Sequence, residues 1–298
     1  MLNLKLYLVK KIIKSYQKKA QWENIPRARA GFEKISKRTP SHHPDVEYEP
    51  FLIEDLKAEW VMPKNADNKN VLLYFHGGGY AVGSPNTHRA MVSQIALEAG
   101  IEAVLLDYRL APESKFKAPI EDAVKAYQWL LKNEYLPENI SFGGDSAGGG
   151  LAFATMLYLR DNNLPLPKCA IALSPWTDLT LSNPSHQTKK EVEPMLLPQA
   201  FPLWVKNYVG DADPRLAYAS PLFGDLKGLP PIYIQVGSDE ILLDDSVLFG
   251  EKAKAAGVSV TIDVYKNYFH VFQSFWQLLP EAKRANKKLG EFLRKNLR

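Results

Sequence analysis

The chain has 298 residues, 46% of them hydrophobic, which suffices for one large packed domain or two small ones. Its 37 basic and 33 acidic residues leave a net charge of +4, too weak to indicate nucleic-acid binding unless the charge is concentrated on one face. The single cysteine, Cys169, lies in an apolar run, so no disulfide framework exists and a reducing compartment is allowed. We expect a cytoplasmic protein.

The N-terminal segment carries the only local excess of charge, with six lysines and no acidic residue in its first 20 positions. Apolar residues recur there at helical spacing, at Leu2, Leu6, Val9, Ile13 and Tyr16. This pattern predicts an amphipathic helix over residues 2–19. The lysines interrupt the apolar residues, which argues against a signal peptide, and the sequence has no run of about 20 apolar residues for a transmembrane helix. We expect no stable membrane insertion.

From Pro63 onward, short apolar runs alternate with helical stretches. The predicted strands cover residues 71–75, 103–106, 139–142, 169–173, 232–236 and 258–265. The predicted helices lie near residues 88–99, 119–133, 147–160, 244–256 and 281–296. Strands that are apolar throughout and are separated by helices indicate an α/β fold, with a mostly parallel sheet covered on both faces.

One segment breaks this alternation. Between Asp178 and Ser220 the sequence has several prolines, a few aromatic residues and short helical stretches, but no convincing strand. Loops longer than about 15 residues between regular elements are uncommon and often cover functional sites. The sequence therefore predicts a lid over a pocket, formed by an insertion at about residues 178–220.

The first motif with chemical meaning is Gly144-Asp145-Ser146-Ala147-Gly148, which follows a predicted strand and opens a predicted helix. In such a turn the backbones come so close that only glycine fits on either side of the serine, whose hydroxyl projects above the sheet. The unpaired N–H groups of the helix N-terminus then face the site and can stabilise a developing negative charge. Ser146 is the predicted nucleophile.

A second motif, His76-Gly77-Gly78-Gly79-Tyr80, directly follows the predicted strand over residues 71–75. Three successive glycines leave the backbone bare, so that N–H groups can converge on one carbonyl oxygen as an oxyanion hole requires. The spacing fits neither a dinucleotide-binding fingerprint nor a phosphate-binding loop. We interpret His76 as a structural hydrogen-bonding residue rather than a base.

A serine hydroxyl is a weak nucleophile until a base removes its proton. In this order of elements the base follows the nucleophile in the chain, which leaves His186 in the predicted lid and His270. His270 lies in the loop after the last predicted strand, where the carboxyl edge of the sheet would present it to Ser146. His270 is the predicted base.

The base needs an orienting carboxylate, and acidic residues follow the predicted strand over residues 232–236. Asp239, in the turn directly after that strand, is the predicted acid. Glu240 is the main alternative. Asp244 and Asp245 fall at the start of the next helix, where acids commonly interact with the helix dipole.

Together these residues resemble the hormone-sensitive-lipase-like family of α/β hydrolases, also called the bacterial type IV esterases. The resemblance spans residues 60–275 and rests on four motifs in family order: His76-Gly77-Gly78-Gly79, Tyr108-Arg109-Leu110-Ala111-Pro112-Glu113, Gly144-Asp145-Ser146-Ala147-Gly148-Gly149, and Gly237-Ser238-Asp239 followed by His270. One departure is mild: many relatives follow the histidine with Gly-Phe, where this chain has Val271-Phe272.

The resemblance implies an α/β-hydrolase fold with a helical cap. It implies that Gly78, Gly79 and Ala147 supply the N–H groups of the oxyanion hole and that Asp239 orients His270. Families of this type cleave short and medium acyl esters without a metal or cofactor. The absence of a His-x-x-x-His or paired-cysteine metal pattern agrees with that expectation.

The resemblance also implies a division of the chain. Residues 1–50 would form the N-terminal helical part of the cap, and residues 51–298 a catalytic domain that carries the cap insertion. The apolar side of the N-terminal helix would then pack on that insertion and roof the active site, with its lysines in solvent. The alternative is an anionic bilayer, to which each lysine would add about 1 kcal/mol of attraction.

The predicted function is therefore that of a serine carboxylesterase with a small-molecule ester as substrate and no nucleic-acid partner. A homodimer is left open. Two alternatives keep the scaffold: hydrolysis of an amide, a carbamate or an acetyl group, and a non-catalytic small-molecule receptor. Retention of a serine, a histidine and a carboxylate in family order argues against the receptor.

Overall fold

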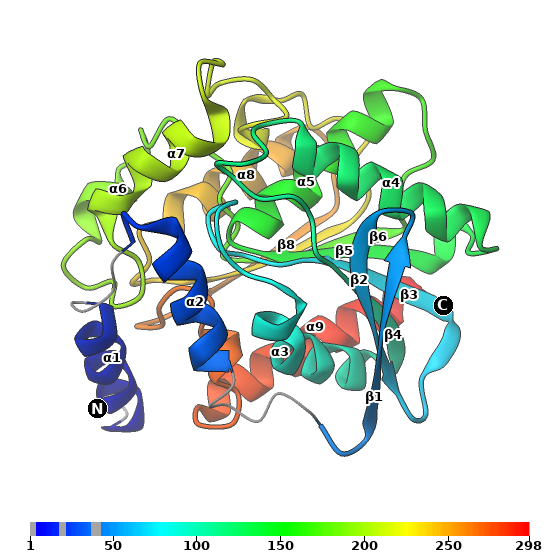
Figure 1. Cartoon of the computed structure of the whole chain (residues 1–298), viewed down its shortest axis with the longest axis horizontal. Coiled ribbons are helices and arrows are strands. Elements are labelled where there is room, and N and C mark those ends of the chain that lie inside the picture. Colours follow the sequence, from blue (N-terminus) through cyan, green and yellow to red (C-terminus); the bar gives the residue numbers. More distant parts are fainter. Residues whose placement is uncertain (1–3, 18–21, 37–42, 298) are drawn as a thin grey trace.

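The structure is a computed structural model that describes residues 4–17, 22–36 and 43–297. An eight-stranded sheet crosses the molecule in the order β1-β2-β4-β3-β5-β6-β7-β8 (Figure 1). Its strands are β1 (Val46–Ile53), β2 (Leu56–Pro63), β3 (Asp67–Phe75), β4 (Ile101–Leu106), β5 (Ile140–Asp145), β6 (Cys169–Leu173), β7 (Ile232–Gly237) and β8 (Val260–Tyr265). The five pairs that join β4 to β8 are parallel, and only the pairs made by β2 are antiparallel. The predicted α/β fold is confirmed.

Helices cover both faces of this sheet (Figure 1). On one face lie α3 (Pro85–Ala99) and α9 (Pro280–Asn296), and on the other lie α4 (Ala118–Lys132), α5 (Ala147–Asp161) and α8 (Leu243–Ala255). Every residue of β5, β6 and β7 is consequently buried. Burial on both faces explains why these strands read as apolar runs in the sequence.

The remaining helices lie beyond the sheet edge, on the side that carries the N-terminus (Figure 1). They are α1 (Leu4–Gln17), α2 (Ile25–Ser36), α6 (Ser185–Thr188) and α7 (Phe201–Val209). Short 3-10 turns are η1 (Pro137–Asn139), η2 (Pro198–Ala200), η3 (Pro221–Phe223) and η4 (Phe272–Phe275). The segment between β6 and β7 contains no strand, as expected for the insertion.

The hairpin of β1 and β2 is an element that the sequence pattern did not predict. β1 is the edge strand of the sheet, most of its residues are partly or fully exposed, and it contains Pro50. An edge strand of this kind shows neither an apolar run nor a regular alternation. Because β1 runs from Val46 to Ile53, the expected division of the chain at residue 50 would cut a strand of the sheet.

α1 covers the described part of the helix predicted over residues 2–19; Leu2, Lys18 and Lys19 lie outside the described residues. Its buried residues are Leu6, Val9, Ile13 and Gln17. Tyr16, predicted on the buried side, is instead 55% exposed. At 3.6 residues per turn, Gln17 lies nearer the centre of the buried stripe than Tyr16 does.

The buried stripe of α1 packs mainly on the segment after β8. Its apolar residues share a cluster with Tyr265, Phe269 and Phe272, which Met195 of the insertion also joins. The expectation that α1 packs chiefly on the insertion is therefore wrong. Its lysines Lys5, Lys11 and Lys14 are exposed, as expected, but Lys10 is partly buried. Lys10 Nζ donates to Asp239 Oδ2 at 2.5 Å.

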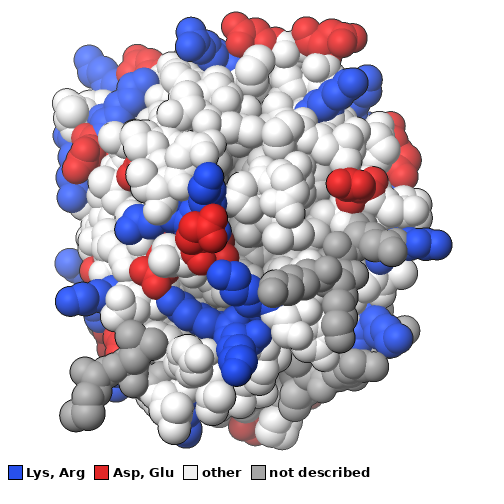
Figure 2. Space-filling view, turned by 90° about the vertical axis from the view of Figure 1, so that its left-hand side faces the viewer, with Lys and Arg blue, Asp and Glu red and all other residues white. Residues whose placement is uncertain are grey.

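The side of the molecule that carries α1 and the insertion has a mixed charge. Figure 2 faces this side and shows basic and acidic side chains next to one another near its centre. Within the described residues, no helix combines the length and the hydropathy needed to cross a membrane.

Candidate active site

Ser146 lies at the turn from β5 into α5, with φ of 54°, a backbone conformation that residues other than glycine rarely adopt. Glycine is required on both sides of it. A Cβ on Gly144 would lie 2.3 Å from the carbonyl oxygen of Gly148, and a Cβ on Gly148 would lie 2.0 Å from that of Phe75. The close approach of strand and helix expected from the motif is thus present, and it holds Ser146 above the carboxyl end of β5.

A buried polar network under Ser146 connects this turn to the glycine-rich loop after β3. The Asp145 carboxylate accepts hydrogen bonds from Tyr74 Oη at 2.9 Å and from the N–H of Gly77 at 3.1 Å. His88 Nε2 lies 3.3 Å from the same carboxylate. Burial alone would raise the pKa of Asp145, but the charge of His88 and these hydrogen bonds hold it below its usual value. An ionised Asp145 therefore fixes the loop relative to the turn.

The glycine-rich loop adopts a conformation that only glycine permits. Gly78 has φ of 117° and Gly79 has φ of 60°, and a Cβ on Gly79 would lie 2.2 Å from the ring of Trp204. Within the described part of the chain, the N–H groups of Gly78, Gly79 and Ala147 donate no hydrogen bond to another loop or turn. These three groups stay the predicted donors of the oxyanion hole.

His76 behaves as a structural residue, as its place at the end of β3 indicates. Its Nδ1 lies 2.8 Å from the carbonyl oxygen of Gly77, and its ring stacks on Tyr108 with centroids 4.4 Å apart. Burial, together with a smaller effect of the neighbouring His88, lowers the pKa of His76 to about 3. A histidine this weakly basic stays neutral and supports the loop.

The structure pairs His270 with Glu240 rather than with Asp239. Glu240 Oε2 lies 3.0 Å from His270 Nδ1, and both side chains are almost fully buried. The prediction of Asp239 as the orienting acid is therefore wrong. Its carboxylate turns outward, is 19% exposed and accepts the hydrogen bond from Lys10.

Further hydrogen bonds hold Glu240 in place. Its Oε1 accepts from Ser174 Oγ at 2.8 Å and from the N–H of Gly237 at 2.5 Å. Ser174 Oγ in turn accepts from the N–H of Val271 at 3.2 Å. With both carboxylate oxygens occupied, Glu240 fixes the tautomer of His270 in which Nδ1 carries the proton and Nε2 is free to act as a base.

Ser146 and His270 are linked through the ends of neighbouring strands. The N–H of Ser146 donates to the carbonyl oxygen of Leu173 at 2.9 Å, and the next residue, Ser174, bonds both Glu240 and the residue after His270. These residues lie at or just after the carboxyl ends of the adjacent parallel strands β5, β6, β7 and β8. The serine, the histidine and the carboxylate therefore share one edge of the sheet.

Two opposing effects set the basicity of His270. Burial lowers its pKa, but the hydrogen bond and the charge of Glu240 outweigh burial, and Glu193 and Asp145 contribute in the same direction. The pKa of His270 is raised above its ordinary value as a result. His270 can therefore accept a proton from a nearby hydroxyl and hold it while Glu240 stabilises the imidazolium.

His186, the other histidine that follows Ser146 in the chain, has a structural role. Its Nε2 lies 3.2 Å from Asp245 Oδ2, an oxygen that also accepts from Asn183. The other oxygen of Asp245 accepts the N–H groups of Thr177 and Asp178. Asp245 and His186 thus connect the start of the insertion to α8. His186 therefore has a structural role and is not the general base.

The aromatic residues of the insertion lie over the glycine-rich loop. Trp204 of α7 contacts Gly79 and meets Trp22 edge-on, with centroids 5.5 Å apart. Tyr208, also on α7, stacks on Tyr80 with centroids 3.8 Å apart. The insertion and the segment before α2 therefore meet above the predicted oxyanion hole.

α2 is fastened to the same region by Arg29. Its guanidinium donates to the carbonyl oxygens of Ala81 and Ala111 at 2.8 Å and forms a two-point ion pair with Glu113. Glu113 belongs to the motif at residues 108–113, which consequently helps to hold the N-terminal helices over the site.

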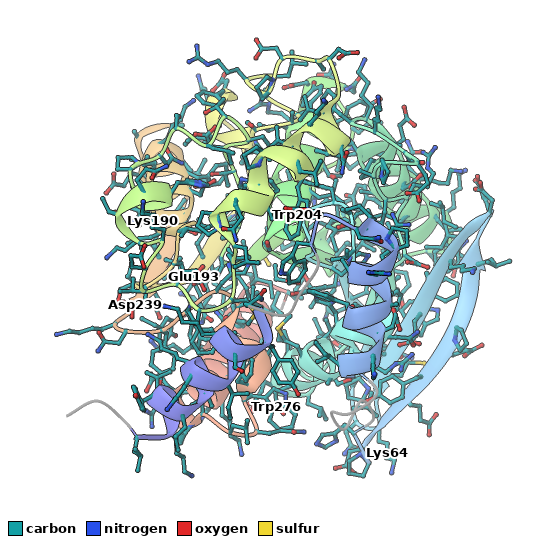
Figure 3. The ribbon with its side chains drawn as sticks, turned by 60° about the vertical axis from the view of Figure 1, so that its left-hand side comes forward. Lys64, Lys190, Glu193, Trp204, Asp239 and Trp276 are labelled. Atoms are coloured by element: carbon teal, nitrogen blue, oxygen red, sulfur yellow. The ribbon has the colours of Figure 1, made fainter. Side chains whose placement is uncertain are left out.

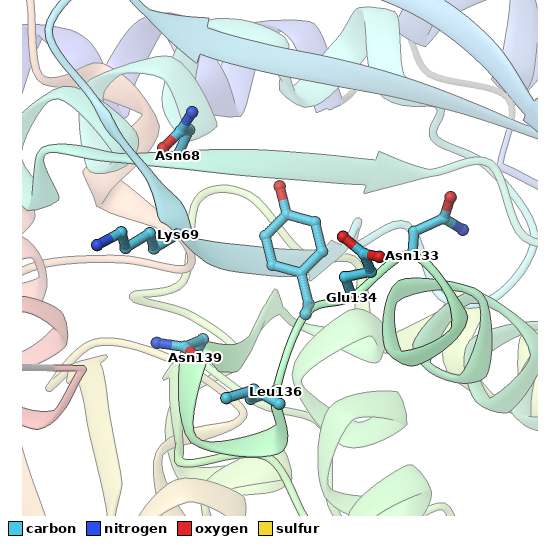
Figure 4. Close-up of a pocket in the computed structure, with 7 residues that line it drawn as sticks. Asn68, Lys69, Asn133, Glu134, Leu136 and Asn139 are labelled. Carbon is cyan, nitrogen blue, oxygen red and sulfur yellow. The ribbon is translucent and has the colours of Figure 1, made fainter.

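Two surface hollows lie away from this site. One, of about 420 Å³, is lined by residues at the start of β3 and by residues that precede β5, among them Asn68 and Asn139 (Figure 4). A second, of about 510 Å³, adjoins Arg29 and Asp107. The first opens at the amino edge of the sheet, opposite the end that carries Ser146.

Comparison with known proteins fits this geometry. A model of the alpha/beta hydrolase fold matches residues 72–274. The chain is 40% identical to an esterase from the bacterial hormone-sensitive lipase family, whose crystal structure superposes with a TM-score of 0.96 over 100% of both chains. The chain belongs to the hormone-sensitive-lipase-like family of α/β hydrolases. The family predicted from the sequence motifs is thus confirmed.

Two relatives are similar in sequence to this member of the family. An acetyl-hydrolase of Streptomyces hygroscopicus is 45% identical over 237 residues, which are 80% of this chain and 79% of the relative. An esterase of Acinetobacter venetianus is 37% identical over 254 residues, 84% of this chain and 82% of the relative. The family likeness thus extends over most of the sequence.

Proposed function

We propose that the chain cleaves short to medium acyl esters through an acyl-enzyme, with these roles: nucleophile Ser146, base His270, orienting acid Glu240, and oxyanion donors Gly78, Gly79 and Ala147. The chain is a serine carboxylic ester hydrolase of the hormone-sensitive-lipase-like family, which agrees with the predicted class of activity. The observation that carries the residue roles is the buried Glu240–His270 pair at the sheet edge that also holds Ser146.

In the proposed mechanism, Ser146 Oγ attacks the ester carbonyl carbon while His270 Nε2 accepts the hydroxyl proton. The carbonyl oxygen becomes an oxyanion held by the backbone N–H groups of the glycine-rich loop and of Ala147. Collapse of this intermediate breaks the bond to the alkoxy group, which takes the proton from His270 as it leaves. Water, deprotonated by the same His270, then attacks the acyl-enzyme and releases the acid.

The cap is proposed to consist of α1, α2 and the insertion. Its support is the contact of Trp204 with Gly79 and the anchoring of α2 by Arg29. The aromatic residues Trp176, Phe201, Trp204 and Tyr208 are all buried in this region, whereas Met195 packs with α1 instead. An apolar but short acyl pocket is the expected consequence.

We expect butyryl and hexanoyl esters to be cleaved with a kcat/KM at least about tenfold above that of palmitoyl esters. The extra methylene groups of palmitate cannot be buried in a short pocket. Each CH₂ that stays in water loses about 0.8 kcal/mol of binding free energy. The measurement is a series of p-nitrophenyl esters from acetyl to palmitoyl. Rapid cleavage of emulsified long-chain triglyceride would instead make the protein a true lipase.

A second candidate is removal of an acetyl group from a larger molecule. The similar Streptomyces hygroscopicus protein is named an acetyl-hydrolase, which favours this reading over amide or carbamate hydrolysis. An acetyl ester cleaved faster than the butyryl ester in the same series would support it. A cytoplasmic location and a homodimer stay predictions.

A further inference from the structure

Helix α1 carries a second apolar stripe, which faces away from the protein. Its members are between 47% and 70% exposed and comprise Leu4, Tyr7, Leu8, Ile12 and Tyr16. Apart from Tyr7 they recur every four residues, a step that advances about 40° around a helix, so they form one continuous stripe. Contiguous exposed apolar surface is unusual on a folded protein and marks an interaction site.

The other side of α1 is already occupied. Its buried residues pack in the cluster with the segment after β8. Lys10 donates to Asp239, and Lys14 Nζ donates to the carbonyl oxygen of Glu191 at 2.9 Å. Figure 3 shows α1 between the labelled Asp239 and Trp276, and Trp276 packs against the same cluster. Because these contacts fix the rotation of the helix about its axis, the second stripe stays exposed.

Lysines border the exposed stripe. Lys5 and Lys11 are both exposed, and each lies three residues from Leu8, which makes it a neighbour of the stripe on the helix surface. α1 contains no acidic residue. On the neighbouring loop Lys190 and Glu191 are both exposed, and their opposite charges leave the balance unchanged. The outward side of α1 is therefore apolar and cationic, which is the pattern of helices that lie in the headgroup region of a membrane.

We propose that the exposed stripe of α1 docks the protein on an anionic lipid surface, with its apolar side chains among the lipid headgroups and Lys5 and Lys11 beside the phosphates. The inference goes beyond the proposed function. It concerns a helix that lies on the lipid surface while its inner side stays packed on the protein, and it needs no segment that crosses the bilayer.

Charge and shape favour lipid over a second copy of the chain. A twofold contact brings the same patch of both copies together. Lys5 and Lys11 would then face the same lysines of the second copy, and α1 has no acidic residue to pair with them. α1 also lies at the margin of the molecule (Figure 1), so a lipid surface can receive its convex side along the whole helix.

The test measures binding of the full chain to vesicles by sedimentation. One set of vesicles contains equal parts of phosphatidylglycerol and phosphatidylcholine, and the other contains phosphatidylcholine alone. We expect the affinity for the anionic vesicles to be at least about tenfold higher at about 0.1 M salt, because each lysine beside an anionic surface contributes about fivefold. In about 1 M salt this difference should be lost, because the Debye length falls to about 3 Å.

The Leu8→Gln/Ile12→Gln variant removes apolar surface from the stripe and keeps every charge. Its affinity for the anionic vesicles should fall by at least about tenfold, since the two glutamines gain little from entering the headgroup region. The matched control is Leu136→Gln/Leu248→Gln, which changes exposed leucines elsewhere on the molecule and should bind as the wild type does. Equal thermal midpoints show that the variants are folded.

The Lys5→Gln/Lys11→Gln variant tests the charge separately. It should bind the anionic vesicles at least about tenfold more weakly, and bind phosphatidylcholine vesicles as the wild type does. Its matched control is Lys132→Gln/Lys254→Gln, which changes exposed lysines of α4 and α8 and should not differ from the wild type.

The inference would be overturned if the wild type did not sediment with anionic vesicles, or if the Leu8→Gln/Ile12→Gln variant bound them equally well. Sedimentation velocity tests the other occupant. A dimer that the same variant converts to a monomer, with unaltered vesicle binding, would assign the stripe to a second copy of the chain instead. None of these measurements uses ester cleavage, so the inference and the proposed function can fail separately.

Discussion

We expect the Ser146→Ala variant to lose at least about a thousandfold in kcat on p-nitrophenyl butyrate, and His270→Ala to lose a similar factor. Without Oγ no acyl-enzyme can form, and without the imidazole the hydroxyl keeps its proton. The residual rate would come from the oxyanion hole and from substrate binding alone. Steady-state kinetics on folded variants gives the comparison.

A matched control for this experiment is Ser259→Ala, because Ser259 is exposed and lies before β8, away from the carboxyl edge of the sheet. Its kcat should equal that of the wild type. The double variant Ser146→Ala/His270→Ala should be scarcely worse than either single variant, since the two residues act as one unit. Additive losses would indicate that they act in separate steps.

The second large effect is expected at Glu240. Replacing it by glutamine keeps the shape of the side chain but removes the charge that stabilises the imidazolium, and it allows the wrong histidine tautomer. We expect the Glu240→Gln variant to lose a thousandfold or more in kcat, approximately. Asp239→Asn should cost far less, because its partly exposed ion pair with Lys10 is worth about 1 kcal/mol or less.

The two variants are matched, because each converts a carboxylate to its amide at adjacent positions of one turn. A larger loss of kcat in Asp239→Asn than in Glu240→Gln would contradict the pairing of Glu240 with His270. Measuring the thermal midpoint of both variants separates the two roles further. Asp239→Asn should loosen α1 and lower the midpoint with little effect on kcat.

The sequence specified the parts of the site whose geometry is local. The turn at Ser146 and the loop at Gly78 and Gly79 need glycine where backbones touch, and that requirement is visible in the motif itself. His270 could be selected by chain order and by its place after the last strand. The central strands could also be predicted from the sequence, because a strand that is buried on both faces is a continuous apolar run.

The acid that orients His270 was harder to assign from the sequence, because Asp239 and Glu240 are adjacent and both follow β7. Which of them faces His270 depends on how the turn packs. One signal was available: Glu240 directly precedes the apolar run Ile241-Leu242-Leu243, which draws it into the core, whereas Asp239 follows the polar Ser238. Long-range partners such as Lys10, 229 residues away from Asp239, cannot be identified from the residues around Asp239 in the sequence.

Glu193, a buried carboxyl group, was missed for another reason. It lies in an irregular loop among charged and polar residues, where a carboxylate usually faces solvent. The packing of Met195 and the contact of Lys14 with the loop help to bury it. The edge hairpin of β1 and β2 likewise depends on pairing with β4, which no short stretch of sequence reveals.

Covalent labelling tests the central claim most directly, because an activated serine should react with a phosphonate that imitates the tetrahedral intermediate. After incubation with a p-nitrophenyl alkylphosphonate, intact-protein mass spectrometry followed by peptide mapping locates the adduct. We predict one adduct per chain, on Ser146, forming in parallel with loss of ester cleavage and absent from Ser146→Ala. Full ester cleavage with Ser146 unmodified, or inactivation through another residue, would contradict the account.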